Sequence, residues 1–379
     1  MQNAKFKMQT KALVIAAFAF CILNLALPAP ALAQAADDDL NAGFTALQKG
    51  DADRAATAFR RALAIEPEHP AALYGAGAAA HLLGRENDAI AFLKRALTAE
   101  PRLIQASALL GEIAYHQGDL GVAIQTYENA LKLTPGNVQL RERLTTWRSE
   151  ASVHDNLRAF KDDRFTILFD GVATANRALA ERATTVLRNA FWRIGQTLGS
   201  YPSNPINVVF YTDRQFRDIT GAPEWAGAGF DGQIRMPVAG ATQNLREFDR
   251  ILTHELTHAM LASIAARNVP AWLNEGLAMY FEGNDAAASE KRLAAARAFV
   301  PLAYLDAGFT ALTSQQADLA YEISAFATSA LMTRIGTGNM RFLLQELDRG
   351  STIDVAMRRF GVTMAEFEAQ LAKRVGARR

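Results

Sequence analysis

The sequence predicts an all-α superhelix of repeated helix pairs at the N-terminus, followed by an α+β domain. Small residues and prolines recur every 34 residues through the first third of the chain. Beyond residue 163 this spacing is lost, and alternating apolar and polar runs are mixed with amphipathic helical patterns. With 379 residues, 50% hydrophobic and 21% charged, the chain is long enough for two or three globular domains.

The segment 1–33 has the pattern of a secretory signal peptide. Three lysines precede an apolar run over residues 12–27, and two prolines and the triplet Ala-Leu-Ala at 31–33 follow it. We therefore expect cleavage before Gln34 and export across the inner membrane to the periplasm. An uncleaved membrane anchor is the alternative, but the run is short for a span and is interrupted by Asn24.

Cysteine content and charge narrow the function classes. The only cysteine, Cys21, lies in the signal, so the mature chain is expected to form no disulfide. A lipoprotein signal would need a small residue before it, where Phe20 stands. Removing the three signal lysines from 40 basic residues leaves 37 against 39 acidic ones, a net charge of −2. This balance predicts no nucleic-acid partner, and we expect no stable membrane span after cleavage.

Five series of residues recur with a spacing of 34 in one phase. They are Gly43, Gly77 and Gly111; Gly50, Gly84 and Gly118; Ala55, Ala89 and Ala123; Ala62, Ala96 and Ala130; and Pro67, Pro101 and Pro135. The larger residues Phe59, Leu93 and Tyr127 follow the same phase. Small residues let antiparallel helices approach closely, and proline follows where a helix stops. The pattern resembles the tetratricopeptide repeat, with three units over residues 36–138 and a capping helix over 139–152.

Stacked repeats of this kind form a superhelix with a concave side. In the tetratricopeptide family this groove binds peptides or partner proteins, so the resemblance implies a protein partner here. The residues expected on the inner side are Leu40, Phe44, Leu47, Tyr74, His81, Glu112, Tyr115 and His116. For each of them the alternative is packing between repeats.

A polar stretch separates the repeats from the α+β domain. We place the repeats with their cap at residues 36–152, a linker at 153–163, and the second domain at 164–379. Candidate strands in that domain are residues 165–169, 206–211 and 232–237, with an amphipathic helix over 173–195. The last of these strands ends in proline, which suits an edge strand.

The helix expected over residues 244–266 contains His254-Glu255-Leu-Thr-His258, an HExxH motif. Two histidines four positions apart differ by about 40° around a helix and about 6 Å along it, so both imidazoles can reach one metal ion. Glu255 points away from that ion and suits a general base for water activated by the metal. The motif alone occurs by accident in roughly 1% of chains of this length, so a third ligand is needed.

Glu275, seventeen residues after His258, completes a candidate metal site. A metzincin would need glycine and histidine where Leu261 and Ile264 stand, so that class is excluded. Pro270 fits the first turn of a new helix, and two antiparallel helices joined by a tight turn would bring Glu275 beside the histidines. Two imidazoles and one carboxylate leave a fourth position for water, the arrangement expected of catalytic zinc.

The segment 270–280, Pro-Ala-Trp-Leu-Asn-Glu-Gly-Leu-Ala-Met-Tyr, together with the HExxH helix, resembles the gluzincins and more closely the peptidase MA-like family. The resemblance covers most of residues 164–379. It implies a zincin-like metallopeptidase fold, one zinc ion per chain at the three ligands, and hydrolysis of a peptide or protein substrate with Glu255 as general base. It also implies that the strand at residues 231–235 lies above the cleft as an edge strand.

Two positions qualify the resemblance. Many gluzincins orient a zinc histidine with an acidic residue four positions after the ligand glutamate, and Met279 stands there instead. By resemblance, Tyr321 would donate a hydrogen bond to the oxyanion, although a tyrosine that only packs in the core is the alternative. We expect a secreted zinc metallopeptidase. The competing hypothesis is a catalytically inactive scaffold or binding protein of the cell envelope that works through its repeats.

Overall fold

The structure is a computed structural model that describes residues 31–221, 228–265, 267–309 and 312–377. Residues 1–30 of the predicted signal therefore lie outside the described residues. Within the described ranges, no helix is both long and apolar enough to cross a membrane. Internal contacts divide the chain between Asp155 and Asn156. The part before this point is the repeat unit, and the part after it is the α+β unit.

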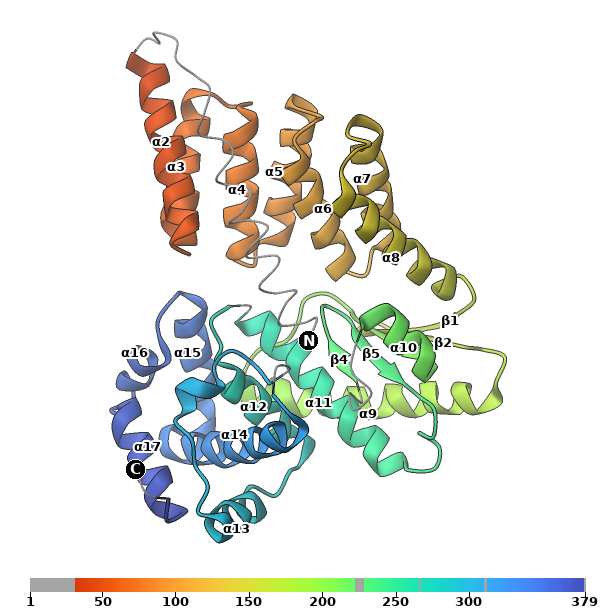
Figure 1. Ribbon diagram of the computed structural model, residues 1–379, viewed down its shortest axis with the longest axis vertical. Coiled ribbons are helices and arrows are strands. Elements are labelled where there is room, and N and C mark those ends of the chain that lie inside the picture. The colour runs from red at the N-terminus through yellow and green to blue at the C-terminus, as the bar shows by residue number, and fades with distance from the viewer. Residues whose placement is uncertain (1–30, 222–227, 266, 310–311, 378–379) are drawn as a thin grey trace. The chain divides into compact units, whose positions relative to one another are not determined.

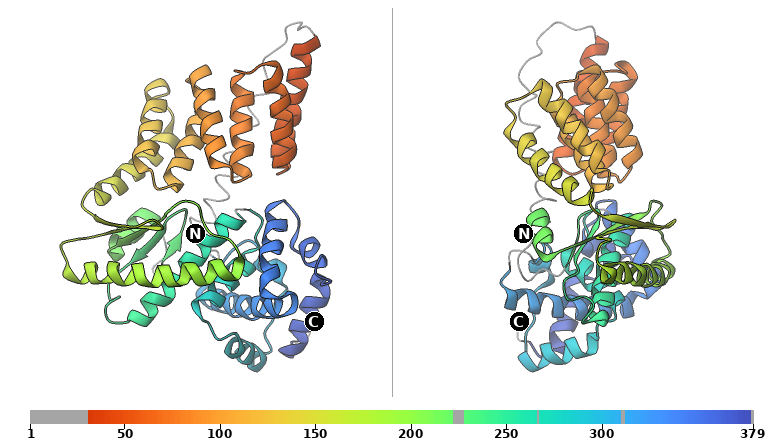
Figure 2. Two further views of the ribbon diagram at one scale, coloured as in Figure 1. Left: turned by 180° about the vertical axis from the view of Figure 1, so that it is seen from behind. Right: turned by 90° about the vertical axis from the view of Figure 1, so that its right-hand side faces the viewer.

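The repeat unit is built from antiparallel helices, drawn from red to olive in Figures 1 and 2. They are α2 (Ala31–Gln48), α3 (Ala52–Ile65), α4 (Pro70–Leu82), α5 (Glu86–Ala99), α6 (Ile104–His116), α7 (Leu120–Leu133) and α8 (Val138–His154). Each helix packs against the next one along the chain, and α8 packs on α7 as a cap. The predicted all-α repeat architecture is confirmed.

The glycine series explains how closely the helices of each pair approach. A Cβ atom would lie within 3.0 Å of the Phe59 side chain at Gly43, of Leu93 at Gly77 and of Tyr127 at Gly111. The larger residue of each repeat is buried against the glycine of the same repeat. The glycine series and the series of larger residues therefore form the two sides of the same helix–helix contact in each repeat.

Half of the residues predicted for the groove are instead packed inside the repeat unit. Leu47, Tyr74 and Tyr115 belong to its buried core. Glu112 is also buried, where it accepts two hydrogen bonds from Arg143 at 3.0 and 2.9 Å. The remaining four, Leu40, Phe44, His81 and His116, are half-buried. Tyr74, Glu112 and Tyr115 are buried because α4 and α6, which carry them, pack against neighbouring helices on both faces.

One five-stranded sheet forms the framework of the α+β unit, in the order β1-β2-β3-β5-β4. The strands are β1 (Arg158–Lys161), β2 (Phe165–Phe169), β3 (Ile206–Tyr211), β4 (Gly229–Phe230) and β5 (Ile234–Pro237). Strands β2, β3 and β5 run parallel to one another, whereas β1 and β4 pair antiparallel at the two edges.

Two sequence predictions about this sheet are corrected. The linker expected at 153–163 contains β1, whose four residues are all exposed and therefore lack the alternation that marks a half-buried strand. The strand expected at the edge, β5, lies one position inside it. The short β4 pairs on its outer side with Ile234 and Arg235, and the terminal Pro237 lies beyond these paired residues.

Helices cover the sheet and complete the α+β unit. They are α9 (Thr174–Leu198), α10 (Asp213–Thr220), α11 (Leu245–Ile264), α12 (Ala271–Glu282), α13 (Ala286–Ala296), η2 (Leu302–Leu305), α14 (Ser314–Ile335), α15 (Thr337–Asp348), α16 (Ile353–Arg358) and α17 (Met364–Arg374). Helix α9 packs on β2 and on α11, and α12 packs between α11 and α14. One buried core includes residues of all these packed elements.

Candidate metal centre

Helix α11 carries the HExxH motif on a firmly anchored element. It begins after Asn244, whose side chain accepts a hydrogen bond from the backbone N–H of Glu247 at 3.2 Å. The residues of its core face, Phe248, Leu252 and Leu256, are buried at helical spacing. His254 and His258 lie on another side and are half-buried. Burial of the apolar face of α11 thus fixes the position of the two imidazoles on its half-buried face.

Helix α12 returns beside α11 and brings Glu275 to the histidines. Asn268, in the connection, has a left-handed φ of 58°, a conformation that asparagine tolerates well. Pro270 is the N-cap of α12. The two helices pack against each other, with Asn274 near His258 at one end of the contact. The antiparallel helix pair predicted from the sequence is the one that the structure contains.

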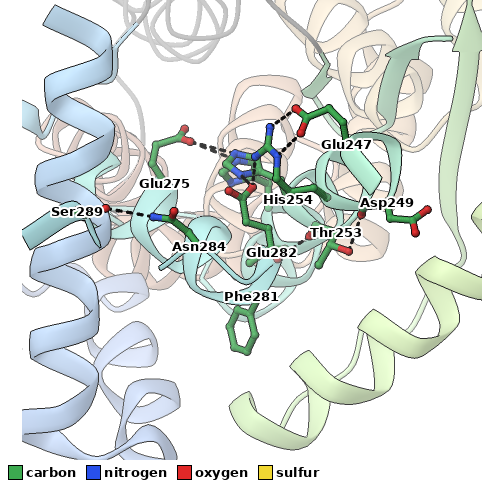
Figure 3. Close-up of polar contacts among 12 residues, drawn as sticks. Glu247, Asp249, Thr253, His254, Glu275, Phe281, Glu282, Asn284 and Ser289 are labelled. Atoms are coloured by element: carbon green, nitrogen blue, oxygen red, sulfur yellow. Dashed lines mark hydrogen bonds and ion pairs between the residues drawn. The ribbon is translucent and has the colours of Figure 1, made fainter. Parts of the chain in front are cut away.

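The three predicted ligands lie together, and Figure 3 labels two of them, His254 and Glu275. Oε2 of Glu275 is 3.3 Å from Nε2 of His254 and 3.6 Å from Nε2 of His258. One ligand atom from each residue lies within 4.8 Å of the others. Ligand atoms about 2.0–2.2 Å from a tetrahedral zinc ion are separated by about 3.3–3.6 Å. The two carboxylate–imidazole distances match this spacing, and the donor set suits a zinc ion with one position left for water.

Both histidines present the same nitrogen to this point. Nδ1 of His254 lies 2.8 Å from Oε2 of Glu282, and Nδ1 of His258 lies 3.3 Å from Oδ1 of Asn274. A carboxylate or an amide oxygen only accepts, so each Nδ1 donates a proton. The Nε2 atoms then face Oε2 of Glu275 and are the nitrogens that can serve as metal ligands, and the two acceptors fix the orientation of the rings.

Glu282 supplies the carboxylate that is absent at Met279. It lies seven residues after Glu275, nearly two helical turns, and so on the same face of α12. Its side chain is 5% exposed, and its Oε2 also accepts a hydrogen bond from Nη1 of Arg250 at 2.7 Å. Glu282 was not predicted from the sequence, because the acid lies almost one helical turn beyond the expected position 279. Its spacing from Glu275 was the available signal.

A glycine follows the ligand glutamate because α14 approaches α12 at this point. A Cβ atom on Gly276 would lie within 3.0 Å of the Thr328 side chain and of the backbone oxygen of Ser324. Any side chain here would push α12 away from α14. The close contact therefore fixes the position from which Glu275 reaches the histidines.

The electrostatics of the site follow from its burial. Burial penalises the charged carboxylate and raises the pKa of Glu255 to about 7, against the opposing charge of His254. Burial lowers the pKa of His254, but hydrogen bonds to Glu275 and Glu282 outweigh it and raise the pKa to about 10. A cation held by the three ligands would favour the carboxylate form of Glu255 and would compete with the proton on Nε2 of His254.

Tyr321 lies on α14, half-buried, with its ring edge-on to Phe309 at 5.1 Å between centroids. Burial raises the pKa of its phenol, and the negative charges of Glu275 and Glu255 raise it further. The hydroxyl therefore keeps its proton near neutral pH. This environment agrees with an oxyanion donor and also with a tyrosine that packs in the core.

Residues 186–375, half of the chain, match the model of the Peptidase MA superfamily, and residues 46–113 and 105–138 match tetratricopeptide repeats. No match was found among curated proteins. A solved structure described as the first TPR of Spaghetti (RPAP3) bound to HSP90 peptide SRMEEVD is 19% identical, with a TM-score of 0.30, and covers 31% of this chain and 97% of that one. The superfamily match contains every residue of the candidate centre, and the chain belongs to the Peptidase MA superfamily.

Proposed function

We propose that the chain is a zinc-dependent peptidase of the periplasm, whose repeat unit binds a protein partner or substrate. The observation that carries this proposal is the convergence of two Nε2 atoms and one carboxylate oxygen within 4.8 Å, with the carboxylate oxygen at zinc-site distances from both nitrogens. The superfamily match supports it because the match extends over the whole centre. The signal pattern of residues 1–33 supports export.

The proposed chemistry assigns a role to each side chain. Zinc held by His254, His258 and Glu275 would polarise the scissile carbonyl and lower the pKa of the attacking water. The carboxylate of Glu255, adjacent to the first ligand, accepts a proton from that water and passes it to the leaving amine. The protonated phenol of Tyr321 donates a hydrogen bond to the developing oxyanion.

The sheet offers a surface for the substrate backbone. Strands β4 and β5 both pack against α11, the helix that carries the histidines. Among the described residues, β4 pairs with only Ile234 and Arg235 on the outer side of β5, so a peptide could extend the sheet beside the end of this strand. An extended peptide that pairs there would run beside the centre, with its scissile bond near Glu255.

One argument for the competing hypothesis, an inactive scaffold, is weakened by Glu282. That argument was Met279, which stands where an orienting acid is expected. Glu282 provides a carboxylate for His254 from the next turn of the same helix, at 2.8 Å. Both histidines therefore have acceptors at Nδ1, as in a maintained metal site.

The proposal is tested with the Glu255→Gln variant and a library of unstructured peptides. We expect the mature protein to cleave peptides and to hold about one zinc ion, and the variant to keep its zinc but lose cleavage, because Glu255 acts on water rather than on the metal. The exposed Glu181→Gln on α9 is the matched control and should leave cleavage unchanged. Zinc-loaded wild-type protein that cleaves nothing in the library would support the scaffold instead.

A further inference from the structure

The repeat unit contains a pocket outside the predicted groove. It has a volume of about 520 Å³ and is lined by residues of α3, α4 and α5, none of which belongs to the eight predicted groove residues. Leu83 and Phe92 give it apolar walls, and Arg60, Arg85 and Arg95 surround it together with one carboxylate, Asp88. We call it the arginine pocket. Its volume lies within the range of ligand sites.

Small residues of α4 leave room for the arginine pocket. Ala76 and Ala80 face it from this helix. One repeat later, 34 residues on, the position of Ala76 is taken by Leu110, which is buried. The space between α3 and α5 is therefore a property of these particular residues and does not follow from the repeat architecture alone.

The positive charges are also particular to this pocket. The residues 34 positions after Arg60, Arg85 and Arg95 are Lys94, Asp119 and Asn129. Three guanidinium groups thus correspond to one cation, one anion and one neutral amide in the next repeat. Arg95 pairs with Glu68 at 2.6 Å. The side chains of Arg60 and Arg85 make no hydrogen bond or ion pair within the described part of the chain.

Arg85 stands where the repeats otherwise place a helix cap. Asp51 and Asp119 are the N-caps of α3 and α7, and each accepts a hydrogen bond from a backbone N–H, at 3.1 and 3.0 Å. Arg85 is the N-cap of α5 and makes no such bond. A positive charge at a helix N-terminus is also unfavourable. Helix stability therefore does not explain this arginine.

We propose that the arginine pocket binds an acidic peptide segment of a partner protein. An apolar side chain of the segment enters between α3 and α5, and flanking carboxylates pair with Arg60 and Arg85. Guanidinium groups bind carboxylates through two parallel hydrogen bonds, and arginine clusters are a recurring means of recognising acidic segments. The proposal is independent of the metal centre.

The test is fluorescence polarisation with the full chain carrying Glu255→Gln, which prevents loss of the peptide by cleavage. The probes are a labelled Glu-Glu-Leu-Glu-Glu peptide and its counterpart with glutamine for each glutamate. We expect the acidic peptide to bind at least about 10-fold more tightly, with an affinity that falls as salt rises. Arg85→Asp and Arg60→Glu should each weaken it by at least about 10-fold.

Arg54→Asp is the matched control. It makes the same change of charge on the first turn of α3, where the side chain is 85% exposed and does not line the pocket, so the affinity should change less than about 2-fold. Arg85→Asp installs the residue found at both equivalent caps, so retained helicity is expected and is checked by circular dichroism. No binding of the acidic peptide, equal binding of the glutamine peptide, or equal losses in Arg54→Asp and Arg85→Asp would overturn the proposal.

Discussion

Glycine permits close helix packing in both units, but its neighbours differ. In the repeat unit, a Cβ atom at Gly77 would lie 2.9 Å from the side chain of Leu93, which can shift, and 3.3 Å from the backbone oxygen of Ala89. At Gly276 in the α+β unit it would meet the backbone oxygen of Ser324, which moves only with helix α14. Damage in a repeat can therefore be absorbed locally. In the α+β unit the same change displaces the helix that carries Glu275, so packing and metal binding are coupled there.

Loss of a ligand should give the largest difference between the units. Glu275→Ala leaves two imidazoles for the ion, so we expect zinc to fall from about one per chain to near zero and peptide cleavage to be lost. Acidic-peptide binding by the repeat unit should be unchanged. Metal analysis and fluorescence polarisation on the same sample measure both. Stoichiometric zinc in this variant would place the third ligand elsewhere, and His258→Ala provides an independent check on the site.

Removal of zinc should change the local stability of the α+β unit but not that of the repeat unit, and this test needs no substitution. A ligand present at 1,000 times its dissociation constant stabilises the folded state by about 4 kcal/mol, and a chelator removes this contribution. We expect faster amide hydrogen exchange in α11 and α12 after chelation, and unchanged exchange in α3 to α6. Equal acceleration in both units would show that the ion stabilises the chain as a whole and would contradict the local role of the centre.

Gly276→Ala and Gly77→Ala place the same methyl group in a helix contact of the α+β unit and of the repeat unit, respectively. Overpacking typically costs about 1–3 kcal/mol, and we expect Gly276→Ala at the upper end because a backbone oxygen opposes the new methyl group. It should also weaken zinc binding. Gly77→Ala should cost less and leave zinc affinity unchanged. Denaturant unfolding gives the stabilities, and chelator competition gives the affinities. A Gly276→Ala variant with normal zinc affinity would remove the proposed coupling between packing and ligand placement.

Glu282→Gln tests the residue that orients His254. Glutamine keeps an acceptor near Nδ1 but loses the negative charge, so we expect zinc affinity to fall by about 10–100-fold. The metal-free variant should also lose stability, because the buried Glu282 pairs with Arg250 and His254, so zinc affinity is compared at a temperature at which both proteins are folded. Glu282→Asp, which restores the charge on a shorter side chain, should recover part of the affinity. Unchanged affinity in Glu282→Gln would mean that Glu282 only pairs with Arg250.

The two units also differ in how much of them the sequence predicts. Repeat packing joins residues close in sequence, such as Gly43 and Phe59, and the 34-residue period displays each contact three times. The metal ligands are also local, because one helix pair carries them. By contrast, the contact of Gly276 with Thr328 joins distant segments, and no local pattern marks it. Strand β1 was missed because an exposed edge strand has no buried face to produce alternation.

The sequence predicts the contacts of charged residues less well than the burial of apolar ones. Glu282 lies one helical turn from the expected place, and the sequence does not show that Arg250 and His254 share its Oε2. The groove residues illustrate the opposite problem. Tyrosines are common on binding surfaces, but Tyr74 and Tyr115 are both buried in the core of the repeat unit. Side chains that fit either role are assigned only by the packing around them.

Exchange of the helix caps should give the smallest effect. An aspartate N-cap is worth about 1 kcal/mol relative to a residue that cannot accept the hydrogen bond, and it also interacts favourably with the helix dipole. Arg85→Asp should therefore stabilise the repeat unit by about 1 kcal/mol, a rise of about 4 °C in its midpoint. Asp119→Arg, the reverse exchange at the equivalent position of α7, should destabilise it by a similar amount. Thermal unfolding followed by circular dichroism measures both. If Arg85→Asp lowers the midpoint, Arg85 stabilises the fold through contacts of its own, and the argument that the arginine is retained for a ligand fails. If the midpoint rises while acidic-peptide binding falls, stability and binding make opposite demands on this one position.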